Sequence, residues 1–206
     1  PRSFVIGSDV FEKFIDENNL YAFIASRPSE EAIAQKFTDS DLPSTTQENL
    51  RVLTQYIKCP LAVRSSSILE DSRILPFAGI YKTYVVPNSH EDTEIRLKQL
   101  SDAVKLVYAS VFYASPIQYA KNADIRIEEE KMAVLIQELV GERYGNYYYP
   151  AISGVAQSYN FYPYYPMKPE DGSVSLALGL GKAIVEGERV YRFSPAHPKL
   201  NPIVSS

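Results

Sequence analysis

The chain has 206 residues, of which 45% are hydrophobic and 22% are charged, an ordinary composition for a soluble globular protein. Its net charge of −4 gives none of the clustered positive charge that nucleic-acid binding requires. No apolar run approaches the ~20 residues of a membrane helix. The single Cys59 cannot form an internal disulfide, which favours a cytoplasmic location. From these three observations we expect no nucleic-acid partner, no membrane segment and a cytoplasmic protein.

The two ends of the sequence predict a piece of a longer protein. The chain begins at Pro1, without an initiator Met or a signal-peptide pattern. It ends in a Pro-rich stretch, residues 194–202, that is typical of a linker or of the lead into another module.

Helical periodicity dominates the first half of the chain. The main signals are a hydroxyl or acidic cap followed by apolar residues on one helical face. Thr45 and Glu48 form a capping-box pattern in front of such a stripe. Helices are predicted over residues 8–17, from residue 28 onward, over 45–58 and over 91–111.

Strand signals dominate the second half, where short apolar runs are bounded by turn residues. The run from Met132 to Leu139 is nearly continuous and predicts a strand buried on both faces. A polar loop is expected from Arg64 to Leu75. Strands are predicted over residues 61–63, 80–86, 132–139, 152–156, 174–178 and 189–193. Together these elements predict an α+β fold.

The most specific local pattern is the strand from Leu61 that leads into Arg64 and three serines. Such a strand end can present the Arg64 guanidinium and the Ser65 hydroxyl to phosphate oxygens. Further on, Gly79 permits close backbone approach to an anion, and Thr83 adds a hydroxyl. A surface arginine beside a Ser-rich turn explains the same residues without a ligand.

Two weaker patterns follow. Gly179-Leu-Gly181 precedes Lys182 at the end of an apolar strand, which can set backbone groups and an ammonium against phosphate, although a tight turn explains both glycines equally well. Gln137 and Glu138 end the buried strand and can meet the edge of a heterocycle, or they can be a plain polar pair.

Ala62-Val-Arg-Ser-Ser66, together with the segment from Phe77 to Tyr84, resembles the signature of the N-terminal ATP-binding domain of the phosphoenolpyruvate synthase and pyruvate phosphate dikinase family. Further matches follow in chain order at residues 1–20, 132–140, 153–155 and 179–187. The resemblance implies an ATP-grasp fold, α+β, with mixed sheets and flanking helices in two lobes, roughly 1–130 and 131–206.

The same resemblance implies a role and a site. In this family two lobes grip ATP and Mg²⁺, and ATP phosphorylates a His on a separate swivelling domain, which then phosphorylates pyruvate held elsewhere in the parent chain. Neither His90 nor His197 sits in a phospho-acceptor pattern, so that step is expected outside this chain. Carried over by position, the nucleotide-binding residues are Arg64, Ser65, Gly79, Thr83, Gln137, Glu138, Leu139 and Lys182.

The sequence departs from the family at charged positions. Two arginines that usually follow the long helix are replaced, at Ser115 and Ala120, and Lys182 stands where the family carries an acid that is expected to ligate the metal. Lys182 cannot ligate Mg²⁺. These changes keep a second interpretation open, a degenerate ATP-grasp module with a regulatory or scaffolding role.

A third interpretation is a Tyr-rich protein-interaction domain. Eight tyrosines crowd the span from Tyr144 to Tyr165, and such clusters suit interfaces because each ring is apolar and each hydroxyl needs a partner. Packing beneath the second lobe is an equally good explanation of the same tyrosines.

Overall fold

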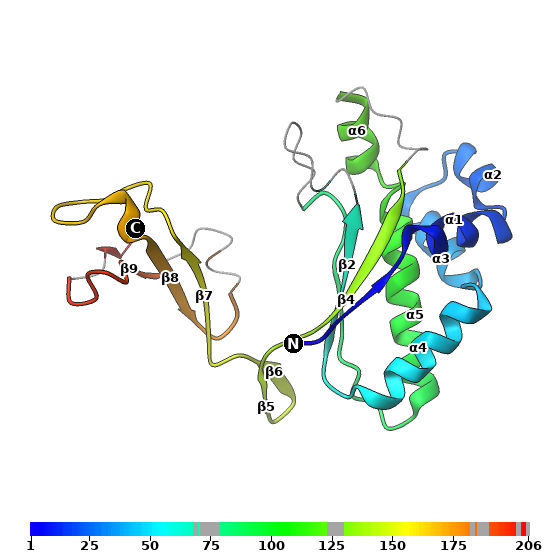
Figure 1. Ribbon diagram of the computed structural model, residues 1–206. Coiled ribbons are helices and arrows are strands. Elements are labelled where there is room, and N and C mark those ends of the chain that lie inside the picture. The colour runs from blue at the N-terminus through cyan, green and yellow to red at the C-terminus, as the bar shows by residue number, and fades with distance from the viewer. Residues whose placement is uncertain are drawn as a thin grey trace. The chain divides into compact units, whose positions relative to one another are not determined.

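The computed structural model describes residues 1–67, 70, 79–122, 130–181, 184, 190–200 and 203–204. The chain forms two compact units, Pro1–Leu139 and Val140–Ser206, and each is described by itself (Figure 1). The boundary between two lobes near residue 130, expected from the family resemblance, stays a prediction. The strand that follows, Met132–Glu138, belongs to the first unit.

The first unit is built on a four-stranded antiparallel sheet in the order β1-β4-β2-β3. Its longest ladder joins β2 to β4, from the pair Leu61–Glu138 to the pair Ser67–Met132. The predicted loop at Arg64 is therefore wrong over residues 64–67, because β4 supplies a partner for the backbone where the side chains show no apolar pattern. The strands are β1 Ser3–Ile6, β2 Leu61–Ser67, β3 Tyr84–Val86 and β4 Met132–Glu138.

Helices pack against this sheet, and the four predicted ones begin within two residues of their expected starts. The Ser29 side chain accepts from Ala32 N at 3.2 Å. The capping box at Thr45 is absent, because the N-cap is Pro43, two residues earlier, and Thr45 lies inside the first turn of the helix. Two short helices, α2 and α6, were not predicted. The helices are α1 Ser8–Glu17, α2 Leu20–Ala25, α3 Glu30–Asp39, α4 Ser44–Tyr56, α5 Thr93–Ser110 and α6 Ala114–Asn122.

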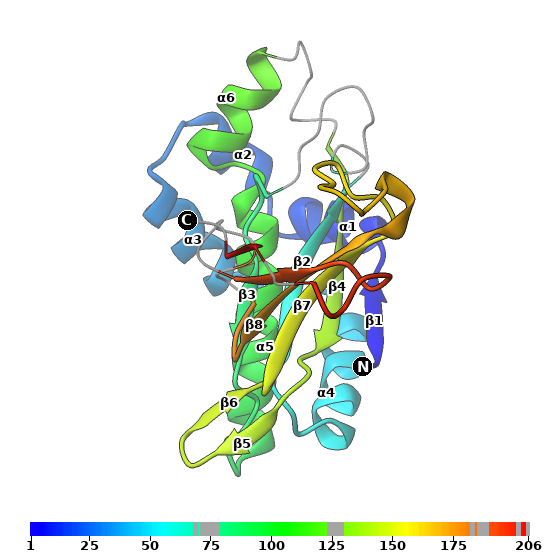
Figure 2. The same ribbon diagram turned by 90° about the vertical axis from the view of Figure 1, so that its left-hand side faces the viewer.

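Aromatic side chains form the centre of the first unit's core. Helix α5 contacts α3 and α4 as well as β2 and β3, whereas α1 packs directly on β4 (Figures 1 and 2). Tyr108 of α5 meets Phe11 at 5.1 Å and Phe14 at 5.6 Å between ring centroids. Phe14 also packs on Phe37 at 5.7 Å. Such ring pairs add stability beyond the apolar area that they bury.

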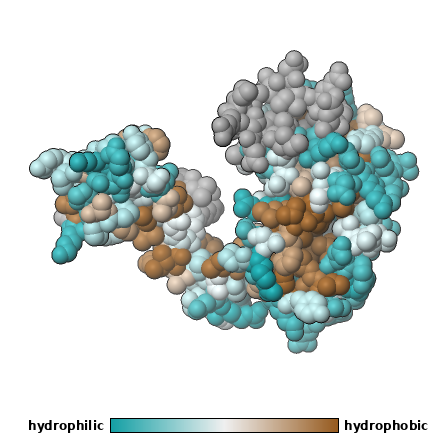
Figure 3. All heavy atoms as spheres, in the orientation of Figure 1, coloured by the Kyte–Doolittle hydropathy of each residue, from teal (hydrophilic) through white to brown (hydrophobic). Residues whose placement is uncertain are grey.

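The other face of the sheet is open within this unit. Along β4, Met132, Val134 and Ile136 are buried, whereas the residues between them are only half-buried. The prediction that this strand is buried on both faces is therefore wrong, since helices cover one face only. On the open face Val5 is 69% exposed and Val85 is 62% exposed. Figure 3 shows apolar residues gathered over the strands of this unit.

The second unit consists of a hairpin and a small antiparallel sheet in the order β10-β9-β8-β7. The hairpin turns at Gly145, whose φ of +62° favours glycine. Strands β7, β8 and β9 follow one another in both sequence and space, as antiparallel neighbours can. The strands are β5 Glu142–Tyr144, β6 Tyr147–Tyr149, β7 Ile152–Gln157, β8 Ser173–Leu178, β9 Tyr191–Phe193 and β10 Ile203–Val204.

The tyrosines between Tyr144 and Tyr165 do not build a core. All of them are exposed or half-buried, and Tyr165 is 95% exposed. Tyr144 and Tyr149 stack at 4.5 Å across the hairpin. The side chains that are buried in the described part of this unit are polar, namely Asn160, Ser173 and Ser194.

The α+β class is confirmed. Every described strand pair is antiparallel, whereas the family resemblance implies mixed sheets. In the part of the chain that the structure describes, no helix combines the length and apolarity needed to span a bilayer.

Candidate functional site

Arg64 lies on the open face of the first unit's sheet. Its ladder partner on β4 is Leu135, and its neighbour along that face of β2 is Ala62. The side chain is exposed, and no hydrogen bond or ion pair with the described residues engages it. A guanidinium in this state can bind an anion without first breaking an internal pair.

Gln137 shares this face with Arg64. It pairs with Ala62 on β2, so Arg64 and Gln137 are diagonal neighbours on adjacent strands. The Cα atoms of such neighbours are typically about 7–8 Å apart. The Gln137 amide donates to Ser3 Oγ at 3.2 Å on the edge strand β1. The structure thus brings these two predicted residues onto one surface.

Glu138 and Leu139 are engaged in holding the sheet together. The Glu138 carboxylate accepts from Arg2 N and from Arg2 Nε, each at 2.8 Å. This hydrogen bonding lowers the pKa of Glu138 below its usual value. The backbone N–H of Glu138 donates to Arg2 O at 3.0 Å, and that of Leu139 donates to Pro60 O at 2.9 Å. Their backbone donors are therefore already occupied within the unit.

Ser65 belongs to a polar network at the end of β2. Its hydroxyl donates to Glu70 Oε1 at 2.9 Å. Ser67 and Glu70 bind each other reciprocally, through Ser67 N to Glu70 Oε2 at 3.2 Å and Glu70 N to Ser67 Oγ at 3.3 Å. This is the capping-box arrangement, and the Ser-x-x-Glu spacing in the sequence is the signal that could have revealed it.

Glu130 and Tyr81 extend this network into the core. The Glu130 side chain is only 8% exposed, and its Oε1 has no hydrogen-bond partner among the described residues. Burial raises the pKa of Glu130, and the nearby Glu70 carboxylate raises it further, while a hydrogen bond from Ser67 opposes both. Burial likewise raises the pKa of Tyr81. Sequence reasoning missed both residues, since neither belongs to a recognisable pattern.

Gly79 and Thr83 lie at the same end of the sheet as Arg64. Gly79 has a φ of +78°, which only glycine adopts readily. Thr83 is exposed and directly precedes β3, whose first residue, Tyr84, pairs with Val63. Residues 68–69 and 71–78, most of the loop between Ser67 and Gly79, lie outside the described residues, as does Lys182.

Sequence reasoning also missed Lys82. It lines a cavity of about 330 Å³ together with Gly79, Ser115 and the Glu30 carboxylate. Glu30 itself accepts from Ala114 N at 2.7 Å, at the start of α6. The cavity therefore places one exposed lysine beside the position where the family carries an arginine, and it places an acid in the same space.

The glycines near Lys182 have a local structural role. Gly179 has a φ of +75°, and its N–H donates to Ala151 O at 2.9 Å. Its carbonyl accepts from Ser153 Oγ at 2.6 Å. These bonds tie the end of β8 to the start of β7, as expected of a tight turn.

The described residues do not provide a set of metal ligands. Within them, no group of three or more His, Cys, Asp or Glu side chains is arranged to hold an ion. Both histidines are engaged, since His90 Nδ1 accepts from Asp92 N at 3.0 Å and His197 lies 3.0 Å from an Asp171 carboxylate oxygen.

Comparison with known proteins places these observations in a family. The family model described as the pyruvate phosphate dikinase AMP/ATP-binding domain matches residues 1–201. The chain is 26% identical to a phosphoenolpyruvate synthase from Aeropyrum pernix, over 91% of this chain and 23% of that protein. It is 27% identical to the uncharacterized phosphotransferase YvkC of Bacillus subtilis, over 91% of this chain and 20% of that protein. The chain thus spans about a fifth of the length of these relatives, and it belongs to the pyruvate phosphate dikinase AMP/ATP-binding domain family.

Proposed function

We propose that the chain binds ATP as the nucleotide-binding portion of a cytoplasmic phosphotransferase that resembles phosphoenolpyruvate synthase. Arg64 is the phosphate anchor, assisted by Thr83 and by the loop that ends at Gly79. The observation that carries the proposal is the state of Arg64, which is exposed on a central strand and unpaired among the described residues. A charged hydrogen bond between a guanidinium and phosphate contributes about 1.5–3 kcal/mol.

The open face of the sheet offers an apolar surface on which the adenine base of ATP can lie. Leu135 lies beside Arg64, and Val85 is 62% exposed on the neighbouring edge strand. A planar purine can cover this apolar surface while its phosphates reach Arg64. The Gln137 amide is within the same surface and can meet the polar edge of the ring, once it gives up its 3.2 Å bond to Ser3.

The proposed reaction uses parts beyond this chain. The phosphate would pass from ATP to a His on a swivelling domain of the parent chain, and from there to pyruvate on a pyruvate-binding domain. His90 and His197 are both engaged in local hydrogen bonds, which supports an acceptor elsewhere. The described residues offer no ligand set for Mg²⁺, so no step is assigned to that ion.

Calorimetric titration of ATP into the chain tests the phosphate anchor. We expect Arg64→Gln to weaken ATP binding by about tenfold or more, the loss of a charged hydrogen bond. Arg27→Gln is the matched control, because Arg27 is also an exposed arginine of the first unit but lies outside the proposed site. Equal ATP affinity in the wild type and in Arg64→Gln would show that the phosphates bind elsewhere.

The degenerate module remains a second candidate because of two observations at the replaced arginines. Ala120 is 1% exposed, so that position now packs in the core. Glu30 lines the cavity at Ser115 and repels phosphate there. If this candidate is right, the wild type binds ATP only at millimolar concentrations, and Glu30→Gln strengthens binding because the amide keeps an acceptor for Ala114 N without the negative charge.

A further inference from the structure

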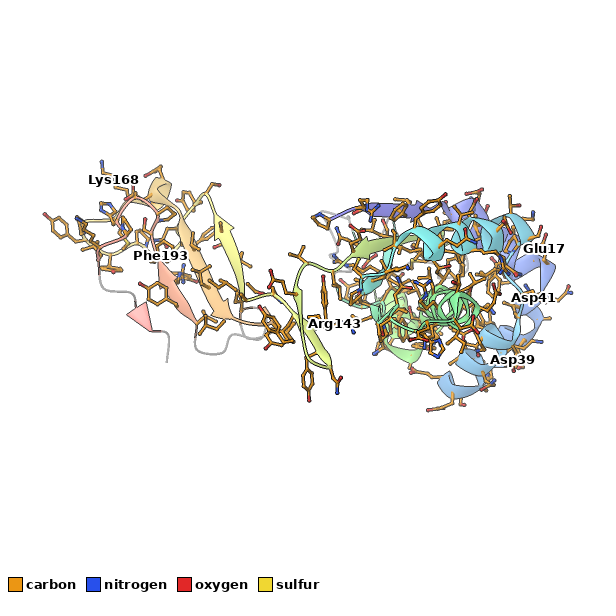
Figure 4. All side chains as sticks on the ribbon, turned by 90° about the horizontal axis from the view of Figure 1, so that it is seen from below. Glu17, Asp39, Asp41, Arg143, Lys168 and Phe193 are labelled. Atoms are coloured by element: carbon orange, nitrogen blue, oxygen red, sulfur yellow. The ribbon has the colours of Figure 1, made fainter. Side chains whose placement is uncertain are left out.

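The second unit contains a cavity with aromatic walls that the proposed ATP site does not use. Its volume is about 200 Å³, and the residues that line it include Tyr162, Tyr164, Phe193 and Met167. Pockets for drug-sized ligands measure roughly 300–1,000 Å³, so this one suits a ligand with a single ring. Figure 4 shows Phe193 on β9 among the side chains of this unit.

Asn160 gives the cavity a fixed polar floor. This residue is only 5% exposed, and its N–H donates to Pro169 O at 2.7 Å. Its side-chain oxygen accepts from Tyr162 N at 3.1 Å and from Arg192 Nη2 at 3.4 Å. The buried Asn160 amide therefore fixes the positions of both the Tyr162 backbone and the Arg192 guanidinium.

Arg192 is the charged side chain that lines this cavity. It lies in the middle of β9, opposite Ser175, and is half-buried. Among the described residues its side chain makes one long hydrogen bond, to a neutral amide, and no ion pair with a carboxylate. The nearby Asp171 carboxylate is instead bound to His197 at 3.0 Å and to Lys168 N at 2.7 Å.

We propose that this cavity binds a small planar aromatic anion, such as an aromatic carboxylate. The ring packs against the tyrosines and the Met167 thioether, each of which attracts an aromatic partner. The carboxylate receives the guanidinium of Arg192, which is planar and can donate two parallel bonds. The site lies wholly within the second unit and does not depend on ATP binding.

Methionine labelling gives a direct test in the intact chain. The chain has two methionines, Met132 in the core of the first unit and Met167 in this cavity, so ¹³C-methyl labelling yields one reporter and one internal reference. Met167→Leu assigns the signals. We expect benzoate to shift the Met167 methyl resonance saturably and to leave Met132 unchanged. Benzamide has the same shape without the charge, and it should bind at least tenfold more weakly.

Substitution of the cation completes the test. Arg192→Gln should weaken benzoate binding about tenfold or more and should leave benzamide unaffected, because only the charged contact is lost. Arg143→Gln, an exposed arginine on β5, is the control and should change neither. The proposal is overturned if Met167 shows no saturable shift, if benzamide matches benzoate, or if Arg143→Gln weakens binding as much as Arg192→Gln. The comparison of benzoate with benzamide on the wild type tests the preference for an anion even if a variant does not fold.

Discussion

The two units hold their chains together by different means. The first buries a continuous set of apolar and aromatic side chains from its helices and its sheet, and Phe11, Phe14, Ile15 and Tyr108 are at most 1% exposed. The described part of the second unit has no hydrophobic residue that is fully buried, and its buried side chains are polar. Apolar burial supplies about 25 cal/mol per Å², so the first unit carries most of the stabilisation from the hydrophobic effect.

The largest expected effect is in the first unit's core. Phe14→Ala removes a fully buried ring that packs on both Phe37 and Tyr108. We expect a loss of about 3–5 kcal/mol in the free energy of unfolding, measured by denaturant titration. Hydrogen exchange should show the loss at first-unit amides. Equal loss at second-unit amides would break the comparison, since it would mean that the two units unfold as one.

A smaller effect is expected in the second unit. Asn160→Ala removes the acceptor of Tyr162 N and of Arg192. Each of these partly buried hydrogen bonds contributes about 0.5–1.5 kcal/mol, so exchange of second-unit amides should accelerate about tenfold or more. Lys199→Ala, an exposed site in the same unit, is the control. Unchanged exchange in Asn160→Ala would show that strand pairing alone holds this unit.

The smallest effect is expected in the pH dependence of the first unit's stability, through Glu130. The pKa of Glu130 is raised by burial, so folding favours its neutral form. The stability that this provides is complete below the unfolded pKa of 4.5 and is lost as pH rises through the higher folded pKa. Glu130→Gln stays neutral, and its thermal midpoint should exceed that of the wild type at pH 7 and match it near pH 4. A constant difference at both pH values would show that titration of Glu130 is not the cause.

Much of the first unit could be predicted, because its elements follow apolar periodicity. The α5 stripe and the β4 run, from Met132 to Ile136, were both recognisable. The extension of β2 through Arg64 was not, since its backbone is satisfied by β4, about 70 residues later, rather than by any local pattern. The bond between Arg2 and Glu138 joins residues 136 positions apart, and no single-sequence signal reports it.

The second unit was harder to predict, though one signal was available. The hairpin Tyr144-Gly-Asn-Tyr147 has a two-residue Gly-Asn turn of a type that favours strand reversal, and this turn is the signal that could have predicted the hairpin. The residues that floor the aromatic cavity, Asn160 and Arg192, come from a loop and a strand 32 positions apart. Only the folded chain brings them together.

The position of β4 between β1 and β2 sets the order of events during synthesis. Among the described strands β1 pairs only with β4, with Ser3 facing Gln137. At roughly 5–20 residues per second, the ribosome needs on the order of ten seconds to make the chain between them. For that time the apolar edge Phe4-Val5-Ile6 stays unpaired in the nascent chain, where it is a ready surface for a chaperone or for a neighbouring copy on the same polysome.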